Sequence, residues 1–310
     1  MDIVEYKGWK NNLRLANADA ELVITLDVGP RIISYSTPGG FNVLKNYEEM
    51  MGGTGESEWQ IRGGHRFWIA PEDLTRTYYP DNAPVAHEAT GPLSVRLTPP
   101  PETKYGIQKV MEVSLAPTGS RVTITLRVTN IGTESTELAP WGPTVMAPGG
   151  IEIVPLPAKY DHPGHPDNAA SPKDYAPNQN LILWPYFDFA DTRWSFGSKY
   201  IFLRQDRTKS QTKIGLAHRM KYVAYLNEGC LFVKWPPYVE GATYPDTGTS
   251  YQTFSNEDML EMETCGVLTT LAPGESAEFT ECWDLFAGVP PIASEADADR
   301  ILPPLLESRM

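Results

Sequence analysis

The chain has 310 residues, of which 41% are hydrophobic and 21% charged, so it can bury a large core and does not have the composition of a disordered protein. Its formal charge of −13 disfavours nucleic acid and anionic membrane surfaces as partners, because binding to either needs clustered Lys and Arg. The N-terminus lacks a secretory signal pattern and no stretch approaches the roughly 18 apolar residues of a membrane span, so we expect a cytoplasmic protein.

The dominant pattern along the chain is the two-residue alternation of half-buried β-strands. In residues 122–128, Val, Ile, Leu and Val alternate with Thr, Thr and Arg. Similar runs, bounded by Gly, Pro and Asn, predict further strands at residues 21–26, 31–35, 93–97, 107–115, 199–203, 221–226, 230–235, 259–264 and 277–285. Many strands without helical segments between them favour an all-β fold, a large antiparallel β-sandwich.

Residues 294–307 show the one helical pattern. Ser294 can cap the helix, and apolar side chains recur along one of its faces. The Pro303-Pro304 pair is expected to end it early. We therefore predict one β-sandwich domain over residues 1–290, with a helical tail at residues 291–310 packed on it.

Two long stretches, residues 50–86 and 158–180, have no convincing strand pattern. Loops of this length in a compact domain are usually functional or disordered. Both stretches contain aromatic residues, such as Trp59, Trp68 and Tyr160, among their Pro, Gly and Asp residues. These aromatics favour ordered loops that cover a face of the sandwich.

Three segments, in order along the chain, resemble segments of a known family. The first is LVITLDVGPRIISY at residues 22–35, followed by GGFNVL at 39–44; the second is RGGHRFW at 62–68. The third is MLEMET at 259–264, followed by LAPGE at 271–275. Together they resemble the galactose mutarotase-like superfamily, which includes aldose 1-epimerases and hexose-6-phosphate 1-epimerases, and they indicate a divergent branch.

This resemblance implies a supersandwich fold, a carbohydrate ligand and specific site residues. Glu263 stands on the strand that resembles the one with the family's catalytic glutamate, and Arg62 stands where the hexose-6-phosphate branch places an arginine in the sugar pocket. The chain departs from the family at one point. Active mutarotases carry a histidine on a central strand after a Thr-Asn element, whereas here Thr129-Asn130 is followed by residues 141–146 without a histidine.

Interconversion of sugar anomers needs a base for the anomeric hydroxyl and an acid for the ring oxygen. Glu263 is the candidate base, because Glu261 and Glu263 share one face of their strand and mutual repulsion there would raise one pKa. Both glutamates could instead simply face water. His65 is the candidate acid, since imidazole titrates near neutral pH and follows a Gly-Gly pair, although a structural hydrogen bond is an equal alternative.

Further residues could hold the substrate. Arg62 offers a planar set of donors for sugar hydroxyls or phosphate, or a salt bridge to a nearby glutamate. Tryptophans could stack on the C–H face of a pyranose, although each alone could equally lie in the core. The predicted substrate-binding residues are Arg62, Trp68, Glu72, His87, Trp141, Trp235 and Glu261.

No phosphate-binding loop, nucleophile elbow or zinc motif is present, so we expect no cofactor and no metal. The leading hypothesis is an aldose 1-epimerase-like enzyme acting on a small-molecule carbohydrate. Two alternatives remain open: a non-catalytic sugar-binding protein, and an oligosaccharide lyase or hydrolase that would use Tyr78, Tyr79 or the Glu261/Glu263 pair.

Overall fold

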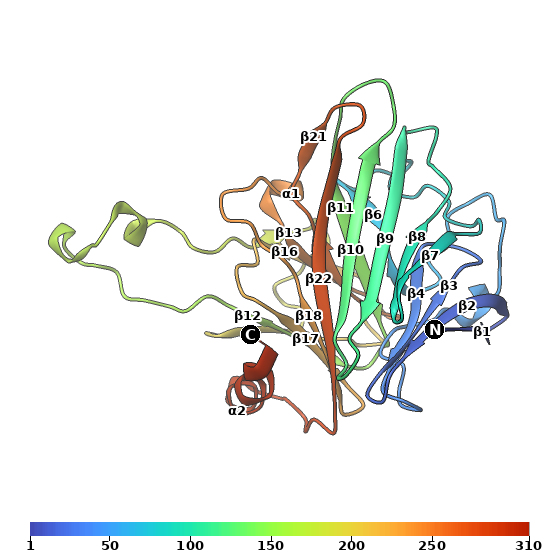
Figure 1. The fold of residues 1–310 in the computed structure, drawn as a ribbon. Helices are drawn as coiled ribbons and strands as arrows, with labels where there is room; N and C mark the ends of the chain where they lie inside the picture. Colours follow the sequence, from blue (N-terminus) through green and yellow to red (C-terminus); the bar gives the residue numbers. More distant parts are fainter. Residues whose placement is uncertain (310) are drawn as a thin grey trace.

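The computed structural model describes residues 1–309, which form two large β-sheets packed face to face (Figure 1). All pairings between the named strands of these residues are antiparallel. The predicted all-β antiparallel sandwich with a short C-terminal helix is confirmed.

Sheet one, the larger of the two, follows the order β1-β2-β3-β4-β5-β11-β20-β19-β16-β13, and β6 and β21 also pair with β11. Its 12 strands are β1 (Asp2–Tyr6), β2 (Trp9–Ala16), β3 (Glu21–Thr25), β4 (Arg31–Ser36), β5 (Gly64–Arg66), β6 (Trp68–Ala70), β11 (Thr136–Met146), β13 (Ile182–Leu183), β16 (Thr212–Leu216), β19 (Tyr251–Ser255), β20 (Leu260–Cys265) and β21 (Thr269–Leu271).

Sheet two follows the order β14-β15-β12-β17-β18-β22-β10-β9-β8-β7. Its 10 strands are β7 (Ala86–Gly91), β8 (Ser94–Thr98), β9 (Ile107–Leu115), β10 (Val122–Asn130), β12 (Ile151–Pro155), β14 (Trp194–Phe196), β15 (Tyr200–Arg204), β17 (Val223–Asn227), β18 (Cys230–Trp235) and β22 (Ser276–Ala287).

The core lies between the two sheets and is built by the alternation seen in the sequence. In β10, Val122, Ile124, Leu126 and Val128 are fully buried, while the residues between them are half-buried or exposed. Each such side chain contributes about 1.5–3 kcal/mol when it leaves water. The same parity rule assigns every strand of sheet one an inner face, turned toward sheet two, and an outer face.

The principal helix is α2 (Glu295–Leu306), whose N-cap Ser294 accepts a hydrogen bond from the backbone N–H of Asp297. The expectation that Pro303-Pro304 ends this helix early was wrong, because the helix continues to Leu306. Its buried side chains pack against apolar residues of β12, β15, β17 and β18 in sheet two. The domain boundary at residues 290/291 stays a prediction.

The remaining helical segments are short. They are α1 (Pro245–Gly248) and the 3-10 turns Glu48–Met50, Pro166–Asn168, Pro172–Tyr175 and Glu307–Arg309. Among residues 1–309, no helix is both long enough and apolar enough to cross a membrane.

The two long stretches without strand patterns behave differently. Residues 50–86 contain β5 and β6, and their Trp59 and Tyr78 pack over Trp68 on the outer face of sheet one, as expected of an ordered covering loop. Residues 158–180 instead extend away from the body, drawn in yellow-green in Figure 1. The expectation that this second stretch covers a sandwich face was wrong.

Candidate functional site

Charged and aromatic side chains gather at the centre of the outer face of sheet one. The register pairs Pro143 of β11 with Glu263 of β20, and Val145 with Glu261. Phe254 of β19 lies opposite Glu261 and, on its other side, opposite Lys213 of β16. Parity therefore places the two glutamates and Lys213 on the same face.

A cavity of about 160 Å³ opens at this position. Five of the residues predicted from the sequence line it: Trp68, Glu72, Trp141, Glu261 and Glu263. Tyr78, named above only for the lyase or hydrolase alternative, also lines it. Five further polar or aromatic residues in its wall were not predicted as site residues: Trp59, Arg66, Tyr186, Lys213 and Phe254. This cavity is the candidate site.

Glu263 and Lys213 form a buried ion pair at the base of the cavity. Lys213 Nζ lies 3.1 Å from Glu263 Oε2, and the two side chains are only 5% and 1% exposed. Burial raises the pKa of Glu263 to about 7, although the Lys213 ammonium partly opposes this shift. Burial also disfavours the Lys213 ammonium, but the carboxylates of Glu263 and Glu72 outweigh it and raise the Lys213 pKa. At neutral pH, Glu263 can therefore both accept and release a proton.

Arg66 and Glu261 form a second buried ion pair beside the first. Arg66 Nη1 donates to Glu261 Oε1 at 2.7 Å, and the Arg66 side chain is 2% exposed. The guanidinium also lies over the indole of Trp68, 3.9 Å from its ring centre. Arg66 is thus fixed by one charge and one aromatic ring, and it orients Glu261 along the wall of the cavity.

Aromatic rings form the other walls. Trp68 lies 5.2 Å from Trp141, 5.0 Å from Trp59 and 4.9 Å from Tyr78, measured between ring centres. The Tyr78 hydroxyl donates to Glu72 Oε1 at 2.5 Å. Such rings present flat apolar surfaces edged with N–H and O–H groups.

Several buried polar atoms of the site have no hydrogen-bond partner within residues 1–309. The acceptor among them is Glu263 Oε1, and the donors are Arg66 Nε and the indole N–H groups of Trp59, Trp68 and Trp141. Buried polar groups are normally paired, so several unpaired groups on residues that line one cavity are a feature typical of a binding site. A ligand with several hydroxyl groups and an apolar C–H face matches both the polar atoms and the rings.

The structure does not bring His65 into this cavity. His65 lies opposite Thr144 of β11, which itself lies opposite Met262, so parity turns the imidazole to the inner face while Glu263 faces outward. His65 is fully buried, with Nδ1 2.9 Å from Thr144 Oγ1 and the ring against Trp283 of sheet two. Burial holds its pKa well below the usual value, so it stays neutral. The assignment of His65 as the acid is therefore corrected.

Three predicted substrate-binding residues also lie elsewhere. The buried Arg62 donates to Glu56 Oε2 at 2.6 Å, which is the salt-bridge alternative raised from the sequence. His87 is exposed on β7, at the edge of sheet two. Trp235 on β18 donates to Asp284 at 2.8 Å and packs with the apolar cluster under α2.

One of the missed residues had a signal in the sequence. In residues 64–70 the side chains alternate, so Arg66 and Trp68 share one face while His65 and Phe67 share the other. If Trp68 faces the site, the alternation places Arg66 in the site as well and turns His65 away from it. Lys213 had no such signal, because nothing in the sequence indicates that β16 lies two strands from β20.

Comparison with solved structures identifies proteins of similar fold. This chain is similar to a TPR-domain containing protein from Parabacteroides distasonis, with a TM-score of 0.59, 15% identity and coverage of 91% of this chain but only 48% of that protein. It is similar to a galactose mutarotase-like protein from Lactobacillus casei, with a TM-score of 0.57, 10% identity and coverage of 89% and 100%. A galactose mutarotase related enzyme from Lactobacillus acidophilus gives a TM-score of 0.53, 10% identity and coverage of 91% and 100%.

No protein-family model and no curated protein matches the sequence itself. At identities of 10–15%, the structural comparisons establish the fold rather than the reaction. The resemblance inferred from the three sequence segments is thus confirmed at the level of architecture: the chain has the galactose mutarotase-like fold.

Proposed function

We propose that the protein binds a carbohydrate in the outer-face cavity of sheet one and interconverts the anomers of an aldose by acid/base ring opening, without a cofactor. The observation that carries this proposal is Glu263: a buried carboxyl with a pKa of about 7 and an unpaired Oε1 in an aromatic-walled cavity. A base with a pKa near the working pH is the most effective proton acceptor. The likeness to proteins described as galactose mutarotase-like or galactose mutarotase related supports the same class of ligand.

In this proposal the first step is a proton transfer to Glu263. Oε1 accepts the proton of the anomeric hydroxyl, the C1–O1 bond becomes a carbonyl and the bond from C1 to the ring oxygen breaks. Rotation about the next C–C bond and closure on the other carbonyl face give the second anomer. Glu263 then returns the proton to O1, so no external oxidant, reductant or metal is needed.

Lys213 is the proposed acid. Its ammonium donates one N–H to Glu263 Oε2 at 3.1 Å, which leaves two further N–H groups for the substrate. The anomeric hydroxyl and the ring oxygen are bonded to the same carbon, so a base and an acid that are neighbours can serve both. Lys213 protonates the leaving ring oxygen and recovers the proton on closure, in place of a histidine.

The remaining residues hold the ring. Trp68 and Trp141 offer rings for the C–H face of the sugar, and Glu72 and Glu261 offer carboxylate acceptors to its hydroxyls. Arg66 acts on Glu261 as a positioning residue through its 2.7 Å contact.

The test measures anomer exchange and binding separately. Saturation-transfer NMR on a panel of aldoses should show exchange above the buffer rate, and Glu263→Gln should lower the rate by about two to four orders of magnitude. Calorimetry should find sugar affinity nearly unchanged in this variant, because Gln keeps the shape of Glu. Glu257→Gln, an exposed neighbour in the loop before β20, is the matched control and should keep full activity.

A second candidate function is sugar binding without catalysis. It is favoured by the absence of any histidine from the cavity wall in the part of the chain that the structure describes, and by the ion pair that already engages Glu263. Sugar binding without acceleration of anomer exchange by the wild-type protein would select it. Absence of binding across the panel would reject both functions.

A further inference from the structure

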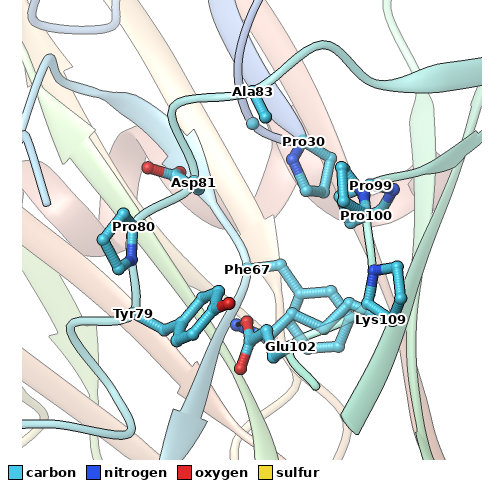
Figure 2. Close-up of a pocket in the computed structure, with 12 residues that line it drawn as sticks. Pro30, Phe67, Tyr79, Pro80, Asp81, Ala83, Pro99, Pro100, Glu102 and Lys109 are labelled. Carbon is cyan, nitrogen blue, oxygen red and sulfur yellow. Dashed lines mark ion pairs between the residues drawn. The ribbon is translucent and has the colours of Figure 1, made fainter. Parts of the chain in front are cut away.

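A second cavity, of about 150 Å³, is shown in Figure 2. It shares no lining residue with the outer-face cavity. It opens between the two sheets, under the turn from β3 to β4 and the loop from β8 to β9. Phe67, which points to the inner face of sheet one, forms its floor together with Lys109 of β9. The proposed sugar chemistry uses none of these residues.

Lys109 stands at a position where the alternation of β9 calls for an apolar residue. Ile107, Met111 and Val113 are buried residues of the same strand face, and Lys109 is buried with them, at 6% exposure. Its Nζ lies 2.6 Å from Glu102 Oε1, and the Glu102 side chain is 9% exposed. Glu102 Oε2 has no hydrogen-bond partner among residues 1–309.

This arrangement costs stability. A buried ion pair is commonly no more stable than two apolar residues of similar volume, and an adjoining cavity adds a further cost. An unpaired carboxylate oxygen beside that cavity is costlier still. Features that lower stability without supporting the fold are typical of binding sites.

The walls define the kind of ligand. Pro30, Pro80 and the run Pro99-Pro100-Pro101 line the cavity, and proline has no backbone N–H to donate. Figure 2 shows the Glu102 carboxylate between the rings of Tyr79 and Phe67. The cavity therefore offers apolar surface beside an unpaired acceptor, Glu102 Oε2, and its lysine is already engaged by Glu102.

We infer that this cavity binds a small, uncharged ring compound with one hydroxyl group, which donates to Glu102 Oε2 while its ring packs among the prolines, Phe67 and Tyr79. An apolar cavity of about this volume accommodates a single benzene-sized ring. A charged ligand would gain little, because Glu102 and Lys109 neutralise each other and the ligand would lose its hydration. A sugar would bury most of its hydroxyls against proline rings without partners.

Calorimetry and ligand-observed NMR on the full-length protein would test this inference, with phenol and benzyl alcohol as probes and benzoate, benzene and glucose as comparisons. The two alcohols should bind, benzene should bind about tenfold more weakly than phenol, and benzoate and glucose should give no signal attributable to this cavity. Failure of both alcohols to bind, or equal binding of benzoate, would overturn the inference.

Two variants locate the site. Ala83 is an exposed residue at the cavity rim, so Ala83→Trp should abolish phenol binding by filling the entrance; Ala86→Trp, on exposed β7 outside the cavity, is the control and should bind normally. Glu102→Gln should weaken phenol binding about tenfold and leave benzene binding unchanged. Should Glu102→Gln fail to fold, the Ala83 and Ala86 pair still decides the matter, since equal phenol affinity in both would refute the assignment.

Discussion

Replacing Lys213 by Met should destabilise the protein in a strongly pH-dependent way. The ammonium of Lys213 is the charge that lies 3.1 Å from the buried Glu263 carboxylate, and both side chains are at least 95% buried. Removing one partner of such a pair leaves an uncompensated buried charge, which costs about 3–5 kcal/mol unless the remaining group takes up a proton instead. That is a large share of the roughly 5–15 kcal/mol that stabilises a folded domain.

The pH dependence follows from the direction of the Glu263 shift. Its folded-state pKa is about 7 with Lys213 present, above the usual value of 4.5 for a glutamate, and loss of the ammonium should raise it further. A carboxyl with a raised pKa contributes stability below its unfolded pKa and loses it as pH rises through the folded pKa. The variant should therefore lose little at pH 5 and about 1.4 kcal/mol more at pH 8, because its carboxyl must then be kept protonated one pH unit above the wild-type pKa of about 7.

Urea denaturation of the wild type and Lys213→Met at the two pH values would measure this difference. Adding Glu263→Gln to Lys213→Met should recover most of the loss at pH 8, because no buried carboxyl then has to be kept protonated. Lys221→Met, at an exposed lysine, should change stability by less than about 0.5 kcal/mol at either pH. An equal loss at pH 5 and pH 8, or a double variant no more stable than the single one, would refute the reasoning.

Three further predictions concern separate parts of the molecule. Trp68→Leu should weaken sugar binding by about five- to tenfold in calorimetry with little effect on the exchange rate at saturation, since it removes a stacking surface and no reacting group; a fall in rate alone would contradict this. Burial raises the pKa of Glu152 to about 7, although the hydroxyls of Tyr251 and Thr253 donate to it. The fall in wild-type stability between pH 4.5 and pH 8 should therefore be about 3 kcal/mol smaller in Glu152→Gln, which has no carboxyl to ionise. An unchanged pH profile in urea titrations would count against the shift. Leu302→Ala should cost about 2–5 kcal/mol in the same titrations, because Leu302 anchors α2 on sheet two, and a loss under 1 kcal/mol would show that the helix contributes little to the fold.

The architecture was readable from the sequence because each strand carries its own two-residue pattern. Residues 107–115 and 122–130 alternate so regularly that their buried faces follow directly. The same parity argument placed Glu261 and Glu263 on one face, and they line one cavity. Local rules were sufficient because the information needed lies within a single strand.

The site was only partly predictable because it depends on which strands become neighbours. Lys213 lies 50 positions before Glu263 in the sequence, and only the sheet order brings them together. His65 was chosen for its chemistry rather than for its parity with Trp68, and a shift of one residue turned it to the inner face. Arg62 was equally attractive chemically, but Glu56 lies close enough in the same loop to bind it.

The extended segment at residues 158–180 has a consequence for how the chain can be divided. It leaves sheet two after β12 and returns to sheet one at β13, and β12 is held between β15 and β17, which both come later in the sequence. The parts of the chain before and after the segment are therefore joined by backbone hydrogen bonds between strands as well as by the covalent chain. A protease that cuts at the exposed Tyr160 or Tyr175 would leave two fragments that stay associated. The same segment is a natural insertion point, where a guest domain can be added without breaking a strand pairing.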